Sequence, residues 1–187
     1  MPDAAPLDPP PDLARLRARQ PAAFTRLVEQ TRRIVLGLGQ SVGLHGADLD
    51  DAAAETYLSV YRALPNYEGR SAVTTWVYTI AVRTISTWRR RAGRGRAAAL
   101  PEAGIASTGP TPAAAAERAE SDERVWSAVA ALEPRSAMAV ELYYRRGLGV
   151  DDVAAALGCP AGTVKTLLFR ARQELKVTLS EEGAAHA

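Results

Sequence analysis

This chain of 187 residues contains few of the residue types on which disulfides, metal sites and many catalytic sites depend. Its one cysteine, Cys159, excludes an internal disulfide framework and a multi-cysteine metal site. With only two histidines, a conventional zinc site or a histidine-based catalytic site is hard to assemble. No apolar run approaches the roughly 18 residues of a membrane-spanning helix, and the proline-rich, acidic start lacks the features of an export signal. We therefore expect a cytoplasmic protein with no membrane association, no metal and no cofactor.

What the chain does contain is ordinary for a globular protein, except in the distribution of its charge. Hydrophobic residues make up 47% and charged residues 24% of the sequence. The formal net charge is only +2, yet six arginines lie between residues 83 and 96 with no acidic residue among them, which leaves −4 for the rest of the chain. Such a concentrated positive field is typical of proteins that bind a polyanion.

The pattern along the chain predicts an all-α fold of two small helical domains joined by a flexible linker. Residues 1–11 hold five prolines and are expected to form a flexible tail. The first domain is predicted over residues 12–92 and the second over 121–180, with a short tail at 181–187. Between them, residues 93–120 are rich in glycine, alanine and proline and show no amphipathic period, as expected of a linker.

Three helices are predicted in the first domain from the spacing of apolar residues. The first begins near Pro21 and continues to Val42, the second runs from Asp48 to Leu64, and the third runs from Val73 to Trp88. The inner stripe of the second helix is predicted to be Ala54, Tyr57, Leu58, Tyr61 and Leu64.

The second domain is predicted to end in a helix-turn-helix, after short helices near 125–132 and 138–143. Ala154 is small enough for two helices to cross, Gly158 can adopt the positive φ of the turn, and Val164 can anchor the second helix in the core. The opposite face of that helix presents Lys165, Thr166, Phe169, Arg170 and Arg172. Such a face can enter a DNA major groove. The alternative is a plain helical hairpin with a solvated basic face.

The third helix of the first domain combines aromatic side chains with arginines. Trp76, Tyr78 and Trp88 lie in it, and the arginine run follows its last turns. Stacking surfaces beside cations suit unstacked bases of a single strand. The alternatives are that both tryptophans belong to the core and that the arginines form a solvated helix end.

Four segments together resemble the bacterial sigma-70 family of RNA polymerase sigma factors, in its small two-domain extracytoplasmic-function (ECF) group. They are AAFTRLVEQ (22–30), DLDDAAAETYLSVYRAL (48–64), TTWVYTIAVRT (74–84) and GTVKTLLFRARQEL (162–175). The resemblance covers roughly residues 12–91 and 122–178. It implies a non-enzymatic subunit that binds core RNA polymerase and directs promoter-specific initiation, with residues 12–92 resembling sigma region 2 and residues 121–180 resembling sigma region 4.

The resemblance also implies roles for individual residues. Docking on the polymerase clamp would involve Asp48, Asp50, Asp51, Tyr57 and Leu58. Opening of the −10 element, with an extruded base held by residues 66–91, would involve Trp76, Tyr78, Arg83, Ser86, Thr87, Arg89 and Arg90. Recognition of the −35 duplex would involve Lys165, Thr166, Phe169, Arg170 and Arg172. Promoter DNA, the clamp and flap regions of the polymerase, and an anti-sigma protein are the implied partners.

Some positions depart from the family pattern. The family commonly has glutamine at the position of Ala54, asparagine at that of Arg83, aspartate or asparagine at that of Thr87, and arginine at that of Leu167. The promoter preference of the family therefore cannot be carried over to this chain. The carboxylates near Asp50 suit a helix dipole or a docking face better than a metal ion. Phosphorylation of Thr56 is a further hypothesis, since it would add charge to that face.

Two other functions compete with the sigma-factor interpretation. A stand-alone helix-turn-helix regulator would explain residues 122–178 equally well, but it leaves the first domain without a role. A nucleic-acid enzyme would need a phosphate-binding loop, a metal-ligand spacing or a nucleophile–base pair, and the sequence shows none of these.

Overall fold

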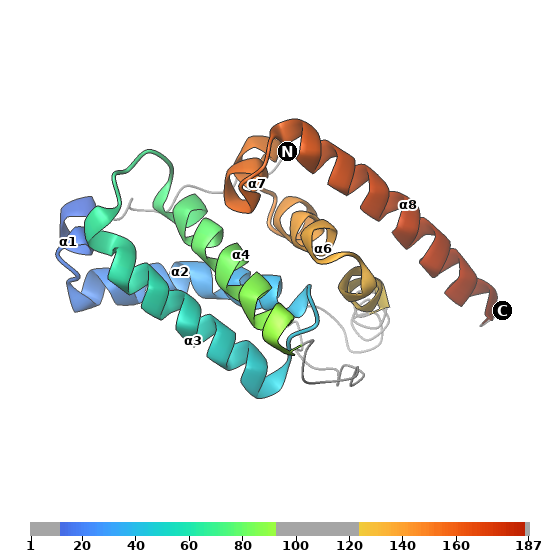
Figure 1. Ribbon diagram of the computed structural model, residues 1–187, viewed down its shortest axis with the longest axis horizontal. Helices are drawn as coiled ribbons and strands as arrows, with labels where there is room; N and C mark the ends of the chain where they lie inside the picture. The colour runs from blue at the N-terminus through green and yellow to red at the C-terminus, as the bar shows by residue number, and fades with distance from the viewer. Residues whose placement is uncertain (1–11, 93–123, 186–187) are drawn as a thin grey trace, which may run out of the picture.

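A computed structural model describes residues 12–92 and 124–185 of the chain, and every regular element in these two ranges is helical (Figure 1). We call residues 12–92 the first lobe and residues 124–185 the second lobe. The all-α prediction with two helical regions is confirmed. The predicted tail at 1–11 and the predicted linker at 93–120 lie outside the described residues. The last helix continues to Ala185, so it extends beyond the domain boundary predicted at residue 180.

The first lobe is a bundle of three long helices that all pack against one another, with a short helix at one end (Figure 1). Its elements are α1 (Leu13–Arg17), α2 (Pro21–Gln40), α3 (Gly46–Ala63), the 3₁₀ turn η1 (Leu64–Asn66) and α4 (Val73–Ala92). Pro21 occupies the first turn of α2, where a missing N–H costs nothing. The sequence pattern does not predict α1, which begins after Asp12, whose carboxylate accepts hydrogen bonds from two backbone N–H groups.

The predicted inner stripe of α3 is wrong at three of its five members, whereas Leu64 is fully buried and Tyr57 is partly buried, as predicted. The residues of α3 that are buried are Ala52, Thr56 and Val60. Leu58 is 54% exposed and Tyr61 is 38% exposed, and Ala54 is also exposed. The inner face thus combines small and polar side chains with Val60, while two of the larger side chains lie outside. A pattern search that follows hydrophobicity alone therefore selects the wrong face.

The second lobe contains the short helices that the sequence predicts. Its elements are a helix at 124–131, α6 (Pro134–Val140), the π-helical turn η2 (Glu141–Arg145), α7 (Val150–Leu157) and α8 (Ala161–Ala185). Met138 and Leu142 are fully buried, as expected. The Glu133 carboxylate accepts hydrogen bonds from two N–H groups at the start of α6. In η2 the N–H of Arg146 donates to the carbonyl of Glu141 at 3.1 Å, and this wider turn directs the Glu141 side chain into the protein.

Helices α7 and α8 form the predicted helix-turn-helix. Gly158 ends α7 in the left-handed conformation, with φ of 61°. Ala154 is buried at 7% exposure, and Val164 is completely buried. The three residues on which the motif prediction depends therefore have the structural roles assigned to them.

The two lobes pack against each other, with α7 beside α4 (Figure 1). The Thr75 hydroxyl donates to Asp152 at 3.4 Å, and the Thr79 hydroxyl donates to the carbonyl of Ala155 at 3.4 Å. At a second contact, a guanidinium N–H of Arg146 donates to the carbonyl of Arg33 in α2 at 2.8 Å. We call this the closed arrangement. It covers one side of α4 with the second lobe.

None of the helices in the described ranges is long and apolar enough to cross a membrane.

Candidate nucleic-acid interface

The outer face of α8 presents the side chains predicted to meet duplex DNA. Lys165, Thr166, Arg170 and Arg172 are all exposed, and Phe169 is 56% exposed although it is aromatic. Within the described ranges, Lys165 and Arg170 take part in no ion pair. Their positive charges therefore remain available to a polyanion.

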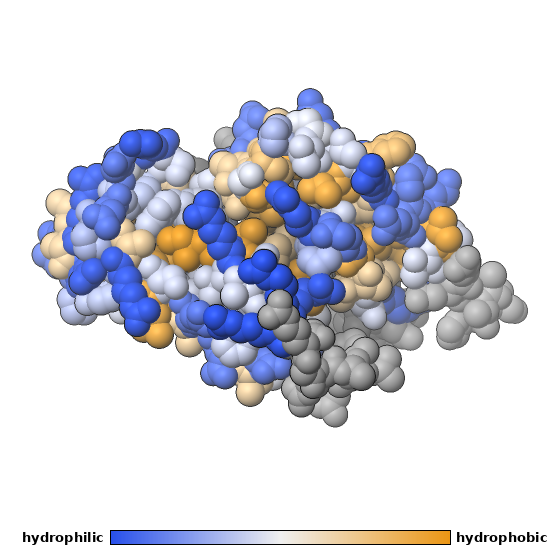
Figure 2. Space-filling view, viewed as in Figure 1, coloured by the Kyte–Doolittle hydropathy of each residue, from blue (hydrophilic) through white to orange (hydrophobic). Residues whose placement is uncertain are grey.

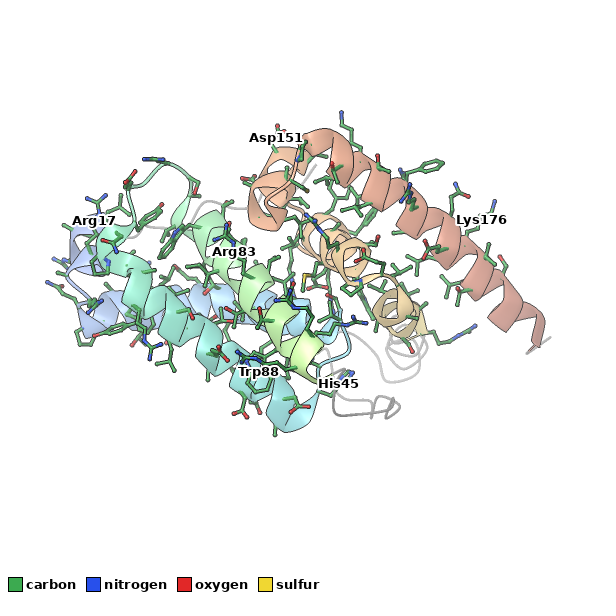
Figure 3. The ribbon with its side chains drawn as sticks, viewed as in Figure 1. Arg17, His45, Arg83, Trp88, Asp151 and Lys176 are labelled. Carbon is green, nitrogen blue, oxygen red and sulfur yellow. The ribbon has the colours of Figure 1, made fainter. Side chains whose placement is uncertain are left out.

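Local contacts orient two of these side chains. The Thr166 hydroxyl donates to the Gly162 carbonyl at 3.0 Å, which leaves its methyl group and an oxygen lone pair outward. The Arg172 Nε donates to the Leu168 carbonyl at 3.2 Å, so this guanidinium is held close to the helix. Lys176 continues the same helix further from the turn (Figure 3). The face is a rigid helical surface with an aromatic ring between cations.

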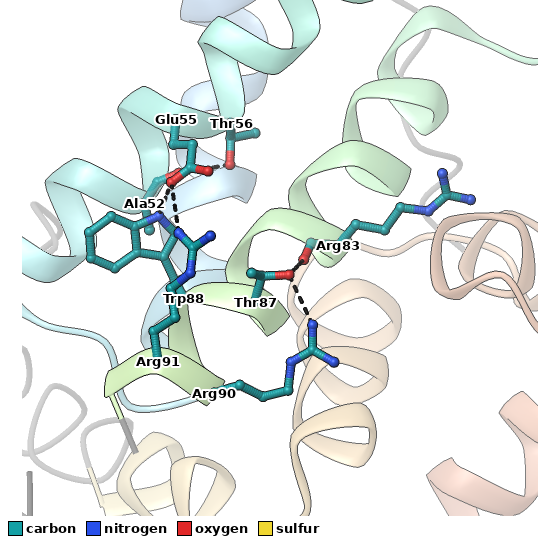
Figure 4. A network of polar contacts seen from close by, with 8 residues as sticks. All are labelled: Ala52, Glu55, Thr56, Arg83, Thr87, Trp88, Arg90 and Arg91. Carbon is teal, nitrogen blue, oxygen red and sulfur yellow. Dashed lines mark hydrogen bonds and ion pairs between the residues drawn. The ribbon is translucent and has the colours of Figure 1, made fainter. Parts of the chain in front are cut away.

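The exposed side of α4 carries the second basic surface, and Figure 2 shows hydrophilic side chains gathered over it. Arg83 and Arg90 are exposed and form no ion pair with another described residue. An N–H of Arg90 donates to the Thr87 hydroxyl at 3.2 Å, and that hydroxyl donates to the Arg83 carbonyl at 2.9 Å (Figure 4). The Arg89 Nε donates to the Val42 carbonyl at 3.0 Å. Arg83, Thr87 and Arg90 therefore lie together, while Arg89 is partly engaged with the loop after α2.

Two of the residues predicted to meet the −10 element are buried or partly buried in the closed arrangement. Tyr78 is buried at 4% exposure, and its burial raises the pKa of the phenol to about 12. Ser86 is partly buried, and its hydroxyl lies 3.9 Å from the sulfur of Met138 in the second lobe. Tyr78 therefore offers no exposed stacking surface in the closed arrangement. Trp76 is half-buried and its ring packs on Tyr67.

Trp88 connects α4 to α3 through Glu55. The indole N–H donates to Glu55 Oε2, and an Arg91 guanidinium nitrogen lies 3.8 Å from the same oxygen (Figure 4). The Glu55 side chain is 44% exposed. One carboxylate therefore serves two groups at the basic end of α4. The sequence pattern does not reveal this contact, because Glu55 and Trp88 are 33 residues apart.

The start of α3 presents the acidic residues predicted to dock on a protein partner. Asp50 and Asp51 are exposed and Asp48 is half-buried. The Tyr57 hydroxyl lies 3.1 Å from that of Thr31, so Tyr57 belongs partly to the contact between α2 and α3. Leu58, two turns after Asp51, is a large apolar residue of α3 that is exposed.

The phosphorylation hypothesis for Thr56 does not agree with the structure. Its side chain is completely buried, and its hydroxyl donates to the Ala52 carbonyl at 2.8 Å. A kinase cannot reach this hydroxyl in the folded lobe. In the part of the chain that the structure describes, no three His, Cys, Asp or Glu side chains lie where they could hold a metal ion.

Family models match both lobes. The model for sigma-70 region 2 matches residues 27–95, and the model for sigma-70 region 4 matches residues 122–175. The chain belongs to the sigma-70 family. It is an ECF sigma factor, a non-enzymatic protein that directs transcription initiation with RNA polymerase. The region 2 match decides against a stand-alone helix-turn-helix regulator, because such a protein would not need the first lobe.

Similar proteins cover almost the whole of this sigma factor. The sigma-H factor of Pseudomonas aeruginosa is 29% identical over 178 residues, which are 88% of this chain and 90% of that protein. The ECF sigma-E factor of Escherichia coli is 29% identical over 170 residues, which are 86% and 88% of the two chains. Because each match covers more than four fifths of this chain, the similarity includes both lobes.

Two solved structures have the same fold. CnrH, in complex with the cytosolic domain of CnrY, matches with a TM-score of 0.68 and 21% identity, and the match covers 90% of this chain and 95% of CnrH. The sigma factor RpoE, in complex with the anti-sigma factor NepR from Bartonella quintana, matches with a TM-score of 0.68 and 20% identity over 84% and 96% of the two chains.

Proposed function

We propose that this sigma factor recognises duplex DNA of the −35 element through α8 and holds the opened −10 element on α4 and the loop before it. The single observation that supports this division most strongly is the contrast between the two basic surfaces. The α8 surface is a convex helix after a tight turn, with an aromatic ring and cations on one face. The α4 surface lies beside a loop and two aromatic rings.

The shape of each surface matches a different form of DNA. A single exposed helix after a helix-turn-helix crossing fits the major groove, where its first residues meet base edges and later cations meet phosphates. On α4, Arg83 and Arg90 can follow a phosphate backbone, while the half-buried Trp76 offers a ring edge near the loop. Arg83 and Thr87, where the family commonly has other residues, lie within this surface, so base preference there is expected to be specific to this protein.

Docking on polymerase is assigned to the start of α3. Asp50 and Asp51 carry the negative charge, and Leu58 supplies exposed apolar surface about two turns further along. Charge attracts a basic partner at long range, and buried apolar area then adds affinity. The clamp is the expected partner of this face, and the flap is expected to meet the second lobe. Action in the cytoplasm, where RNA polymerase and promoter DNA meet, is part of the same proposal.

The closed arrangement has to open for this function. α7 lies on the side of α4 that holds Thr75 and Thr79, and Tyr78 of α4 is buried in this arrangement. CnrH and RpoE, which share the fold, are each in complex with another protein, and for RpoE that protein is an anti-sigma factor. We propose that an anti-sigma protein stabilises the closed arrangement of this chain and that polymerase binding replaces it.

Run-off transcription tests the proposal. Transcript start sites mapped after overexpression supply the promoter, which is then transcribed by core polymerase with and without this protein. A promoter-dependent product that requires both proteins supports the function, and its absence refutes it. Asp51→Arg should abolish the product and copurification with core polymerase while helicity is retained. Glu29→Arg, the same charge reversal at an exposed carboxylate of α2, is the matched control and should keep both.

A further inference from the structure

The loop between η1 and α4, residues 67–72, is held from the inside by a tyrosine. Tyr67 is only 5% exposed although the residues around it are exposed. Its hydroxyl donates to the carbonyl of Ser71, which closes the loop four residues later. Its ring packs on Trp76 of α4, with the ring centres 4.8 Å apart and the planes inclined by 35°. The loop therefore has its own internal support.

Helix α1 holds the same tyrosine from the outside. The Arg17 Nε donates to the Tyr67 carbonyl at 2.8 Å, across 50 residues of sequence. Figure 3 shows Arg17 at the end of the first lobe where this loop lies. Gly69, at the tip of the loop, has φ of 77°, and a Cβ at this position would lie 3.5 Å from a methyl carbon of Leu13. Both ends of the short helix α1 therefore lie against the loop.

The outward side of the loop is polar. Glu68, Arg70 and Ser71 of the loop are exposed, as is Asn66 at the end of η1, and Glu68 pairs with Arg70. Together they offer an amide, a carboxylate, a guanidinium and a hydroxyl, which can all bond to the edge of an unstacked base. A loop with such groups reads a base selectively only if its backbone keeps one shape, because ordering a mobile loop on binding costs affinity.

We propose that Arg17 and Tyr67 are positioning residues for promoter recognition: they hold the loop in the shape in which it receives a base extruded from the −10 element. This inference rests on the proposed function of α4 and its loop. Arg17 precedes residue 27, where the match to sigma-70 region 2 begins, so the family match does not cover it. The chemical target is a single unstacked nucleobase, and neither Arg17 nor the Tyr67 hydroxyl is proposed to touch it.

A selection experiment tests the inference for any promoter sequence. Holoenzyme made from core polymerase and this protein is incubated with a pool of single-stranded DNA randomised over the −10 positions, and bound strands are sequenced. Wild-type protein should enrich one motif. Arg17→Ala should lower affinity for that motif about tenfold, as expected for one lost hydrogen bond from a charged donor. It should also flatten the preference at one base position.

Three further variants separate positioning from general stability. Tyr67→Phe keeps the ring on Trp76 and removes only the bond to Ser71, so it should reduce the same preference with little change in melting temperature. Arg17→Lys keeps a cationic donor and should restore most of the preference. Arg15→Ala is the matched control, since its side chain is 65% exposed and pairs only with Asp12 among the described residues; it should behave like wild type.

Each outcome decides a different question. If the wild-type holoenzyme enriches no motif, the proposed function of α4 fails. If wild type enriches a motif and Arg17→Ala and Tyr67→Phe enrich it equally well, the positioning role is overturned. The positioning role is also overturned if Arg15→Ala loses the base preference as well. The same holds if the loss of base preference is accompanied by a proportional loss of core-polymerase binding. Loss of base preference with polymerase binding and −35 duplex binding intact supports it.

Discussion

Gly37 of α2 lies directly against the buried carboxylate of Glu141. A Cβ at Gly37 would lie 2.1 Å from Glu141 Oε1 and 2.4 Å from a terminal nitrogen of Arg146. The Glu141 carboxylate and the Arg146 guanidinium form an ion pair at 2.8 Å, and Arg146 also donates to the carbonyl of Arg33. The lobes therefore meet at a buried ion pair that reaches the backbone of α2 only because residue 37 has no side chain.

Gly37→Ala should loosen the closed arrangement while it stabilises α2. Alanine is favoured over glycine in a helix interior by about 0.5–1 kcal/mol, but the added methyl group has no room beside Glu141, and such overpacking costs about 1–3 kcal/mol. Small-angle scattering should show a larger radius of gyration for the variant. Gly162→Ala in α8, where a Cβ meets nothing within 4 Å, should leave the radius unchanged. An equally small radius for Gly37→Ala would contradict this role of the glycine.

Stability should depend on the pH through Glu141. Burial raises the pKa of this carboxyl group above its ordinary value, although Arg146 and Arg145 oppose the rise. Between the ordinary pKa, about 4.3, and the raised one, the folded chain binds more protons than the unfolded chain. The free energy of unfolding contributed by Glu141 therefore falls as the pH rises through that window.

Melting temperatures measured against pH test this prediction. Wild type should lose stability relative to Glu141→Gln as the pH rises from about 4, because glutamine does not titrate. The comparison cancels the titration of other groups that the two proteins share. A difference in melting temperature that stays constant across the window would show that burial does not raise the pKa of Glu141.

The Trp88–Glu55 contact should stabilise the first lobe. Trp88→Phe and Glu55→Ala each remove one partner of the hydrogen bond between α3 and α4. Since the acceptor is charged but 44% exposed, we expect a coupling free energy of about 1 kcal/mol. A double-mutant cycle measured by urea unfolding gives this value directly. Additive effects of the two changes would mean that the bond does not contribute.

Arg170→Ala should weaken binding to −35 duplex DNA at all sequences and reduce the salt dependence. Removal of one phosphate contact lowers the slope of log K against log salt by about one. Fluorescence anisotropy at several salt concentrations measures both quantities. Lys176→Ala, at an exposed cation further along α8, should change them less. An unchanged slope for Arg170→Ala would remove that residue from the interface.

The helix-turn-helix could be predicted because its determinants are local. Ala154, Gly158 and Val164 lie close together in the sequence, and each is selected by a steric requirement that the sequence displays. The face of α3 could not be predicted in the same way. Its buried residues Ala52 and Thr56 are small or polar, whereas the exposed Leu58 is among its most apolar residues.

Other features depend on contacts between distant segments. Tyr78 is an aromatic residue of the kind that stacks on bases, but the folded protein buries it. Arg17 shows no pattern that distinguishes it from Arg15, yet only Arg17 donates to the loop carbonyl 50 residues later. Periodicity reports which face of a helix is apolar, but it does not report which other element covers a face or which carbonyl accepts a hydrogen bond.

The division of labour between α8 and α4 is the central claim, and promoter binding to duplex and pre-opened templates tests it most directly. Holoenzyme with Lys165→Ala and Arg170→Ala should lose affinity for duplex promoter but still bind a template whose −10 element is already unpaired. Holoenzyme with Arg83→Ala and Arg90→Ala should keep duplex binding and fail to hold the unpaired strand. If both pairs of changes impair the two templates equally, the two surfaces do not have separate roles and the account is wrong.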